Sequence, residues 1–268
     1  MNRKRGHFRY LNREKKERNL EELFGDDGRV LVVPMEHLER YGKEPVDWVK
    51  AAEGIIAGGA DAICTVPALL KKYHKILMNR IPVIMTTPLD IDFLDYAAKM
   101  GCNGVKTGFY GPPLESINGE LVEKFALRCD ELGLTFCWEP IPFTKGYYSD
   151  LKRDPDNKPC NDVLTLQRVV YTGMMWGADY LKIEYTGDPE SMKQVTKYPI
   201  PITIHGYEKI PARKALERLK SAMEGGVIGA YYGRNVYFHE NPEAMTRALI
   251  KIIHENATVE QAMKELEE

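Results

Sequence analysis

Short apolar runs alternate with amphipathic stretches along the whole chain, and this alternation restricts the possible folds more than any other feature of the sequence. Each apolar run is rich in Val, Ile or aromatic residues, as expected of a strand that is buried on both faces in a parallel sheet. The eight runs are residues 29–38, 61–67, 82–87, 104–110, 135–141, 179–185, 202–207 and 226–234.

Helices are expected between these strands. In residues 45–58, for example, Val46, Val49 and Ile56 recur at helical spacing. Several stretches end in a glycine such as Gly133, because glycine allows the left-handed backbone that stops a helix. The other predicted helices are residues 89–100, 120–133, 163–177, 189–197 and 211–225, with terminal helices at 242–256 and 259–267.

Eight β/α units predict an α/β fold, a (β/α)8 TIM barrel formed by one domain over residues 1–268. Such a barrel typically needs about 250 residues, and the chain has 268. A doubly wound open sheet is the main alternative. Residues 1–24 are polar, and we expect them to form a helical extension that packs across the barrel or a neighbouring subunit rather than binding an anion.

Composition and charge exclude several classes of function. The chain carries 37 Lys and Arg against 39 Asp and Glu, a net charge of -2, whereas proteins that bind nucleic acid are usually basic. No apolar run reaches the roughly 18 residues that span a membrane, and none follows the basic N-terminus, so neither a membrane partner nor a secretory signal is expected. The five cysteines include no CxxC pair, which argues against disulfides and a zinc ribbon and favours buried thiols in a cytoplasmic protein.

In a (β/α)8 barrel, the active site lies at the carboxyl ends of the strands. Polar residues near the predicted strand ends are therefore the candidates for chemistry. They are Glu36, His37, Lys106, Tyr110, Trp138, Glu139, Lys182, Glu184, Tyr185, His205, Gly206, Gly233, Arg234 and Asn235.

Lys182 is the clearest of these candidates because it lies inside the largely apolar strand YLKIEY. Burial lowers the pKa of a lysine, and a neutral lysine can attack a carbonyl carbon and form a Schiff base. The alternative is a structural ion pair within the barrel. Glu184 is the expected partner in that case, since strand alternation points it the same way.

The ends of the last two strands have the usual position of a phosphate site in these barrels. Gly206 and Gly233 would let backbone N–H groups approach a phosphate, and Arg234 would bind it with a two-pronged guanidinium. A structural arginine is the alternative. Lys106 has several possible roles: the covalent lysine itself, a cation that lowers the pKa of Lys182, a ligand of the substrate, or a salt-bridged structural residue.

Histidines and glutamates near the strand ends do not have the spacing of HExxH or a similar metal-binding motif. We therefore expect neither a metal nor another cofactor. Residues 145–158 are expected to form either a mobile lid or a plain solvated loop, and Asp188 is expected to cap a helix. The histidines and glutamates considered are His37, His205, His239, Glu36, Glu139 and Glu184.

Four segments carry a family resemblance: LEELFGDDGRVLVVPMEH, EGIIAGGADAICT, GADYLKIEYTGDPESMKQV and GGVIGAYYGRNVYFHENPEAMTRALIKIIHENATVEQA. From about residue 10 to the C-terminus, the chain resembles the DhnA-type class I aldolases. These include archaeal-type class I fructose-bisphosphate aldolase, 2-amino-3,7-dideoxy-D-threo-hept-6-ulosonate synthase and the autoinducer-2 thiolase. The resemblance implies a (β/α)8 barrel, a Schiff-base lysine at Lys182 and a phosphate site at Gly206, Gly233 and Arg234. It also implies a homo-oligomer, such as a decamer or a pentamer.

Three motifs of the family are altered here. The Asp-His-Gly motif of the first strand is replaced by Glu36, His37 and Leu38, and the glycine pair after the seventh strand becomes His205-Gly206. The family also places a proton-transferring tyrosine near the end of the fifth strand, in Tyr-Pro-Arg-Gly, whereas this chain reads CWEPIPFTKG.

Glu139 is the expected replacement for that tyrosine, because a carboxyl group in an apolar pocket can have a raised pKa that suits proton transfer. Tyr147 or Tyr148 in the following loop, or Tyr185 on the sixth strand, are the alternatives.

These observations predict a metal-independent class I aldolase that acts on a small phosphorylated sugar or keto compound. Lys182 attacks the carbonyl, Lys106 supplies positive potential, Glu139 or a tyrosine such as Tyr185 moves the hydroxyl proton, and Glu36 orients hydroxyls or assists loss of water. Two alternatives are a thiolase-like acyl or ketol transferase and a non-catalytic barrel that binds a sugar phosphate. The expected phosphate- and substrate-binding residues are Gly206, Gly233, Arg234, His205 and His37.

Overall fold

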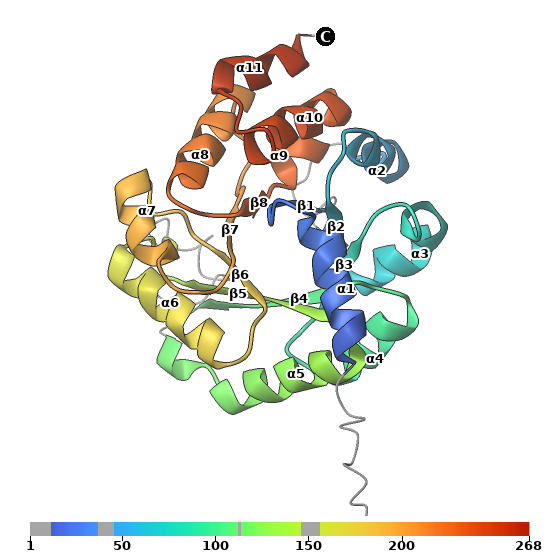
Figure 1. Ribbon diagram of the computed structural model, residues 1–268, viewed down its shortest axis with the longest axis vertical. Coiled ribbons are helices and arrows are strands. Elements are labelled where there is room, and N and C mark those ends of the chain that lie inside the picture. The colour runs from blue at the N-terminus through green and yellow to red at the C-terminus, as the bar shows by residue number, and fades with distance from the viewer. Residues whose placement is uncertain (1–11, 37–45, 112–113, 146–155, 268) are drawn as a thin grey trace, which may run out of the picture.

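The strands form a closed parallel barrel in the computed structural model, which describes residues 12–36, 46–111, 114–145 and 156–267. Each strand pairs with the next one in sequence, and β8 pairs with β1 through Val30 and Gly229. This closure confirms the predicted barrel and excludes the open sheet (Figure 1). The strands are β1 (Val30–Pro34), β2 (Ala62–Thr65), β3 (Val83–Thr86), β4 (Gly104–Gly111), β5 (Thr135–Pro142), β6 (Tyr180–Ile183), β7 (Ile202–His205) and β8 (Gly229–Tyr231).

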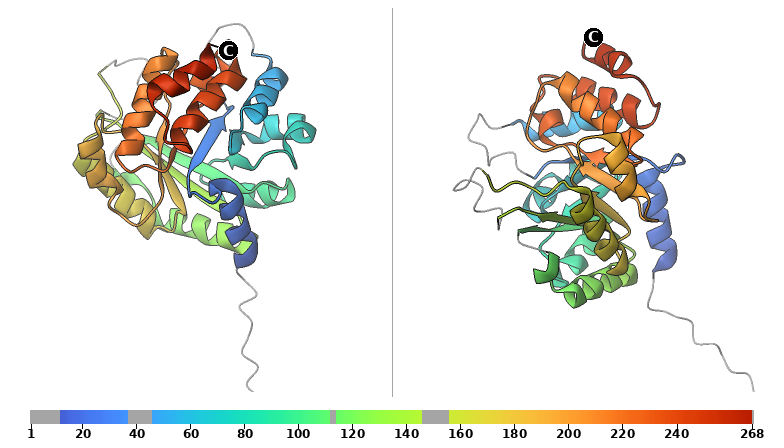
Figure 2. Two further views of the ribbon diagram at one scale, coloured as in Figure 1. Left: turned by 45° about the horizontal axis from the view of Figure 1, so that its top comes forward. Right: turned by 90° about the vertical axis from the view of Figure 1, so that its left-hand side faces the viewer.

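Helices form an outer ring around the strands (Figures 1 and 2). Two helices were not predicted, α3 (Pro67–Leu77) and α9 (Arg234–Tyr237). In α3 only Leu70 and Leu77 are buried, so its apolar face is too sparse to stand out in the sequence. The other helices are α1 (Arg13–Phe24), α2 (Trp48–Ala57), α4 (Asp92–Lys99), α5 (Gly119–Leu132), α6 (Val163–Met175), α7 (Pro189–Thr196), α8 (Ala212–Glu224), α10 (Pro242–Ile253) and α11 (Val259–Met263), with short 3-10 turns at Leu114–Ser116 and Lys264–Leu266.

Local capping determines where several helices begin and end. The Asp188 carboxylate accepts a hydrogen bond from the Ser191 backbone N–H at 2.9 Å, which confirms its predicted role as a helix cap. Gly133 ends α5 in the left-handed region with φ of 68°, as its position in the sequence indicated. No helix in the described parts of the chain is both long and apolar enough to cross a membrane.

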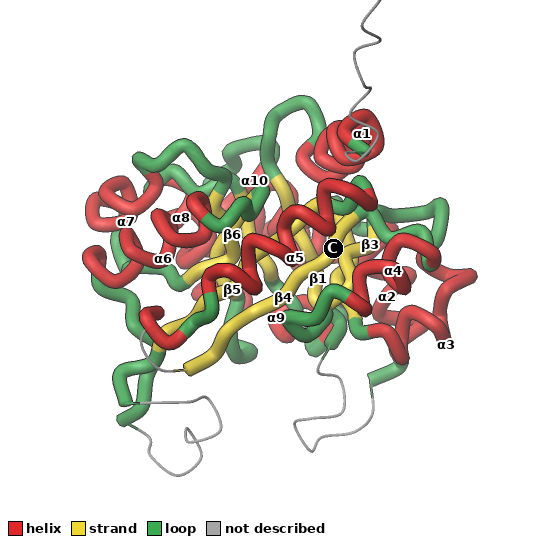
Figure 3. Tube along the Cα trace, turned by 90° about the horizontal axis from the view of Figure 1, so that it is seen from below, coloured by secondary structure: helices red, strands yellow, loops and turns green. Residues whose placement is uncertain are grey.

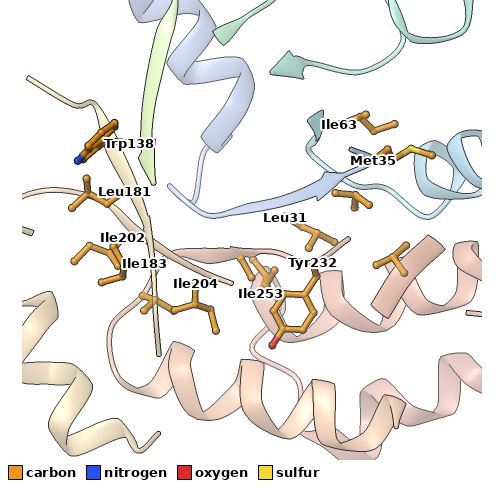
Figure 4. Close-up of a cluster of buried hydrophobic side chains, with 14 of the residues drawn as sticks. Leu31, Met35, Ile63, Trp138, Leu181, Ile183, Ile202, Ile204, Tyr232 and Ile253 are labelled. Carbon is orange, nitrogen blue, oxygen red and sulfur yellow. The ribbon is translucent and has the colours of Figure 1, made fainter. Parts of the chain in front are cut away.

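The core has two layers because successive residues of a strand point to opposite sides. Residues such as Leu31 and Val33 face the helices (Figure 4 shows part of this outer layer). Val30, Val32 and Tyr180 belong to a second cluster, which fills the barrel interior. Four of the five cysteines are buried, as expected: Cys64, Cys102, Cys129 and Cys137.

The helix α1 covers the amino-terminal end of the barrel. Its Lys16 Nζ lies 2.8 Å from the Asp179 carboxylate just before β6, and its Asn19 amide donates to the Gly133 carbonyl at 2.7 Å. Figure 3 shows α1 at one end and α9, which follows β8, at the other. The carboxyl ends of the strands are therefore not covered by α1.

Candidate active site

A cavity of about 970 Å³ opens at the carboxyl ends of the strands. This volume is at the upper end of the range that is usual for small-molecule sites, about 300–1,000 Å³. Nearly all the predicted site residues line it. They are Glu36, Lys106, Glu139, Lys182, Tyr185, His205, Gly206, Gly233 and Arg234. His37, Tyr147 and Tyr148 lie outside the described residues, as does most of the expected lid.

Glu139 on β5 is the centre of the charged groups in this cavity. Its Oε2 lies 2.5 Å from the Lys106 Nζ, and its Oε1 contacts the Lys182 Nζ. The Tyr110 hydroxyl donates to the same Oε2 at 2.5 Å, and the Nδ1 of His205 is 3.3 Å from Oε1. One buried carboxylate is therefore shared by two lysines from the neighbouring strands β4 and β6.

The expectation that Glu139 has a raised pKa is wrong. Burial alone would raise the pKa of this carboxyl group, but the charges of Lys106 and Lys182 outweigh burial and hold it below its usual value. The sequence suggested an apolar pocket because β5 is apolar around Glu139. The two ammonium groups come from other strands, so the fifth strand alone does not reveal them.

Lys106 and Glu36 extend the charged group toward β1. The Lys106 Nζ lies 3.2 Å from the Glu36 Oε1, and the Thr86 hydroxyl also donates to this oxygen at 2.5 Å. Burial lowers the pKa of Lys106, but the negative charges of Glu139 and Glu36 outweigh the effect of burial and hold this pKa well above its usual value. The two carboxylates therefore favour the charged form of Lys106, which suits electrostatic stabilisation better than nucleophilic attack.

Lys182 has a different carboxylate partner from the one expected. Its Nζ contacts Glu139 rather than Glu184, and it lies 4.8 Å from the centre of the Tyr231 ring. Lys182 and Glu184 both line the cavity, as strand alternation predicted. The amino group thus lies inside the barrel, beside a carboxylate that can take its proton.

Glu184 is a buried carboxyl group of the cavity with a raised pKa. Burial raises its pKa to about 8; Arg218 opposes this increase, Glu139 adds to it and Lys182 opposes it. The Tyr207 hydroxyl donates a hydrogen bond to its Oε1. Strand alternation indicated that Glu184 faces the cavity, but nothing in the sequence indicated that it is protonated there.

The Glu184 proton makes stability depend on pH. The folded protein holds this proton up to about pH 8, whereas the unfolded chain releases it near the ordinary value of 4.5. Between these values the folded state binds one more proton, so the free energy of unfolding falls as the pH rises, by up to about 1.4 kcal/mol per unit.

We expect Glu184→Gln, which stays neutral, to lack this fall and to exceed the wild type in stability at pH 8. Urea denaturation of the two proteins at pH 5, 7 and 9 measures the difference. Parallel pH profiles would contradict the assignment.

His205 and Tyr185 differ from their expected roles. Burial and the charge of Lys182 hold the His205 pKa well below its usual value despite Glu139, so this imidazole is neutral and supplies no charge for a phosphate. The Tyr185 hydroxyl lies 2.6 Å from the Ser221 Oγ on α8. This geometry favours a role for Tyr185 in positioning α8 over a role in proton transfer.

The two glycines of the expected phosphate site are required for packing. A Cβ on Gly206 would lie 2.9 Å from the Tyr232 ring, and a Cβ on Gly233 would lie 2.4 Å from the Pro34 carbonyl oxygen. Their lack of a side chain therefore does not by itself indicate a phosphate. The two loops are nevertheless joined, because the buried Asn235 amide donates to the Gly206 carbonyl at 2.8 Å.

No cluster of three or more His, Cys, Asp or Glu side chains within the described ranges is arranged to hold a metal ion. His239, one of the histidines considered from the sequence, contacts the Asn241 backbone and does not line the cavity.

A family model described as "DeoC/LacD family aldolase" matches residues 26–239. The chain belongs to the DeoC/LacD aldolase family. This confirms the family resemblance and the interpretation of the protein as an aldolase.

Two curated relatives of this DeoC/LacD aldolase match nearly full length. An uncharacterized aldolase of Saccharolobus solfataricus is 28% identical in an alignment that covers 89% of this chain and 94% of the relative. The 2-amino-3,7-dideoxy-D-threo-hept-6-ulosonate synthase of Halobacterium salinarum is 27% identical, with 88% and 91% covered.

Among solved structures, a Schiff-base-forming fructose-1,6-bisphosphate aldolase has a TM-score of 0.73 at 18% identity. The match covers 90% of this chain and 100% of that one. At this identity the likeness supports the barrel fold of the DeoC/LacD aldolase and carries no residue roles.

Proposed function

We propose that Lys182 forms the Schiff base with the carbonyl carbon of a phosphorylated sugar or keto compound. The observation that carries this proposal is the contact between the buried Lys182 Nζ and Glu139, inside the cavity at the carboxyl ends of the strands. The names of two relatives from Halobacterium salinarum support a keto substrate of this kind. One is the hept-6-ulosonate synthase described above, and the other is a class 1 fructose-bisphosphate aldolase that is 28% identical over 63% of this chain and 62% of the relative.

The reaction begins when Lys182 loses a proton to Glu139 and attacks the carbonyl carbon. The carbinolamine hydroxyl then takes this proton back from Glu139 and leaves as water, which gives a cationic iminium and an ionised Glu139. In cleavage, the hydroxyl group β to the iminium carbon loses its proton and the carbon–carbon bond breaks. The electron pair of that bond moves toward the iminium nitrogen, which leaves a neutral enamine and releases an aldehyde.

Glu139 is suited to accept the hydroxyl proton even though its pKa is low in the resting protein. The charge of Lys182 is one of the causes of that low pKa. The iminium keeps this charge, and the enamine loses it. The carboxylate therefore becomes a stronger base as the carbon–carbon bond breaks, when the hydroxyl proton is released.

Lys106 and Glu36 complete the proposed site. Lys106 remains a cation beside Glu139 and stabilises negative charge on substrate oxygens. Glu36, held by Lys106 and Thr86, accepts hydrogen bonds from substrate hydroxyls or assists the loss of water.

We propose that a substrate phosphate binds against the loops that follow β7 and β8. Arg234 and the backbone of Gly206 and Gly233 line this part of the cavity, and Asn235 holds the two loops together. The homo-oligomer implied by the family resemblance stays a prediction, which the mass of the protein in solution tests.

The test is an assay of carbon–carbon cleavage with a panel of phosphorylated ketoses and keto acids. The released aldehyde is measured with a coupled dehydrogenase. We expect cleavage without added metal ion or coenzyme A. Turnover that requires coenzyme A would indicate an acyl transferase instead of an aldolase. Tight binding without turnover would indicate a non-catalytic binding protein.

A further inference from the structure

Arg218 on α8 lies in the cavity wall, and no carboxylate in the described part of the chain forms an ion pair with it. Among the residues that the structure describes, nothing forms a hydrogen bond or an ion pair with its guanidinium, and its Nε is buried without a partner. Its guanidinium carbon lies 5.9 Å from the centre of the Tyr185 ring and 5.7 Å from that of Tyr207. Lys106 and Lys182, by contrast, are neutralised by carboxylates.

The fold holds Arg218 against the cavity through its neighbours. Ser221 lies three residues further along α8, on the same face of the helix as Arg218. Its hydroxyl bonds to Tyr185, which follows β6. This contact fixes the face of α8 that carries Arg218 over the carboxyl ends of β6 and β7, where the cavity opens.

Tyr207 supports Arg218 from the loop after β7. Its backbone has φ of 50°, in the left-handed region that a tyrosine rarely adopts. In this conformation its hydroxyl donates to Glu184, and its ring contacts both Arg218 and the His205 ring, whose centre is 5.3 Å away. The disfavoured backbone conformation of Tyr207 therefore lies where its side chain contacts Glu184, Arg218 and His205.

The chemistry of this group suits an oxyanion. A guanidinium has only donors, in a planar fork that matches a carboxylate, phosphate or sulfonate. The carboxyl group of Glu184 is protonated up to about pH 8, so at neutral pH it offers a further donor and no negative charge. A neutral hydroxyl group of a sugar would leave the charge of Arg218 without a counter-ion.

We propose that Arg218, with Glu184 and Tyr207, binds a second anionic group of the substrate, distinct from the phosphate placed at Arg234. The proposal rests on the proposed function and narrows it to keto compounds with two oxyanions. The second group is a phosphate, a sulfonate or a carboxylate at the end of the molecule that enters between the loops after β6 and β7.

The test compares the wild type with Arg218→Gln, Arg218→Lys and the control Lys214→Gln, which removes an exposed charge from the same helix. Each protein is assayed with a ketohexose 1,6-bisphosphate and the matching 1-phosphate. We expect Arg218→Gln to lower kcat/KM for the doubly charged compound by about 10- to 100-fold, the size of a lost charge-assisted hydrogen bond. The singly charged compound and the control should stay within about threefold, and Arg218→Lys should recover part of the loss.

Equal losses for the two compounds would overturn the proposal, because a purely structural arginine would affect them alike. If the wild type cleaves neither compound, calorimetric titration with inorganic phosphate, sulfate and malonate decides the matter separately from the aldolase reaction. Binding that weakens in Arg218→Gln but not in Lys214→Gln would support the anion site, and the anion that binds most tightly would identify its chemistry. Binding that does not depend on Arg218 would refute it.

The pH dependence of anion binding gives a second readout. The groups that interact with Glu184 are Arg218, Glu139, Lys182, Cys160 and Tyr207. Ionisation of Glu184 above pH 8 should weaken anion binding by the wild type, because a second negative charge then faces the ligand. Glu184→Gln should bind the anion equally well at pH 7 and pH 9. The same loss between these pH values in both proteins would exclude Glu184 from the site.

Discussion

Replacing Lys182 by arginine is expected to lower kcat/KM for carbon–carbon cleavage by about 10,000-fold or more, because the covalent route is removed. Arginine keeps a positive charge beside Glu139 but cannot form an imine. The fold is therefore expected to survive, which circular dichroism and the melting temperature check. If the larger side chain prevents folding, Lys182→Ala provides the same loss of the nucleophile.

The same substitution at Lys106 is the matched control for this prediction. Lys106 contacts the same carboxylate from the opposite neighbouring strand, and it is as deeply buried. Lys106→Arg keeps the positive potential that we assign to this residue, so we expect a loss of at most about 100-fold. If Lys106→Arg were inactive and Lys182→Arg active, the nucleophile would be Lys106.

Replacing Glu139 by glutamine is expected to affect both stability and activity. Two buried ammonium groups would lose their shared counter-ion, and breaking a buried ion pair of this kind typically costs about 3–5 kcal/mol of unfolding free energy. Loss of the proton acceptor is expected to lower kcat by about 100- to 10,000-fold. Urea denaturation and steady-state kinetics at pH 7 measure the two effects.

Glu184→Gln is the control for Glu139→Gln, because it makes the same change of side chain without removing a buried negative charge. Glu184 lies in the same cavity but carries a proton at pH 7, so its replacement by glutamine removes no buried charge. We expect it to lose no stability at this pH. Equal stability losses in the two glutamine variants would mean that Glu139 is not the counter-ion of the lysines.

The barrel was predictable because its signals are local. Each apolar run and each helix end is a property of a few consecutive residues. Each of the eight predicted runs overlaps an observed strand, and β4 and β5 end one residue beyond the predicted runs. The predicted runs extend beyond several strands. β6, for example, ends at Ile183, so Glu184 and Tyr185 belong to the loop that follows it.

The candidate site was predictable only in part, because its chemistry depends on contacts between strands. Strand alternation brought Lys106, Glu139 and Lys182 into one cavity, as expected. It did not show that the two lysines share Glu139, and so it led to the wrong sign for the Glu139 pKa shift. Arg218 was missed because it lies on a helix, where its spacing is that of an ordinary surface residue.

The central claim, a Schiff base on Lys182, is tested most directly by chemical trapping. The wild-type protein is incubated with each phosphorylated ketose or aldehyde in the presence of borohydride, which reduces an imine to a stable amine. Intact-mass spectrometry then measures the mass of the adduct, and peptide mapping identifies the modified residue. We predict one adduct per chain, on Lys182, with the substrate class given by the compound that traps best. An adduct on Lys106, or no adduct with a compound that the protein cleaves, would contradict the account.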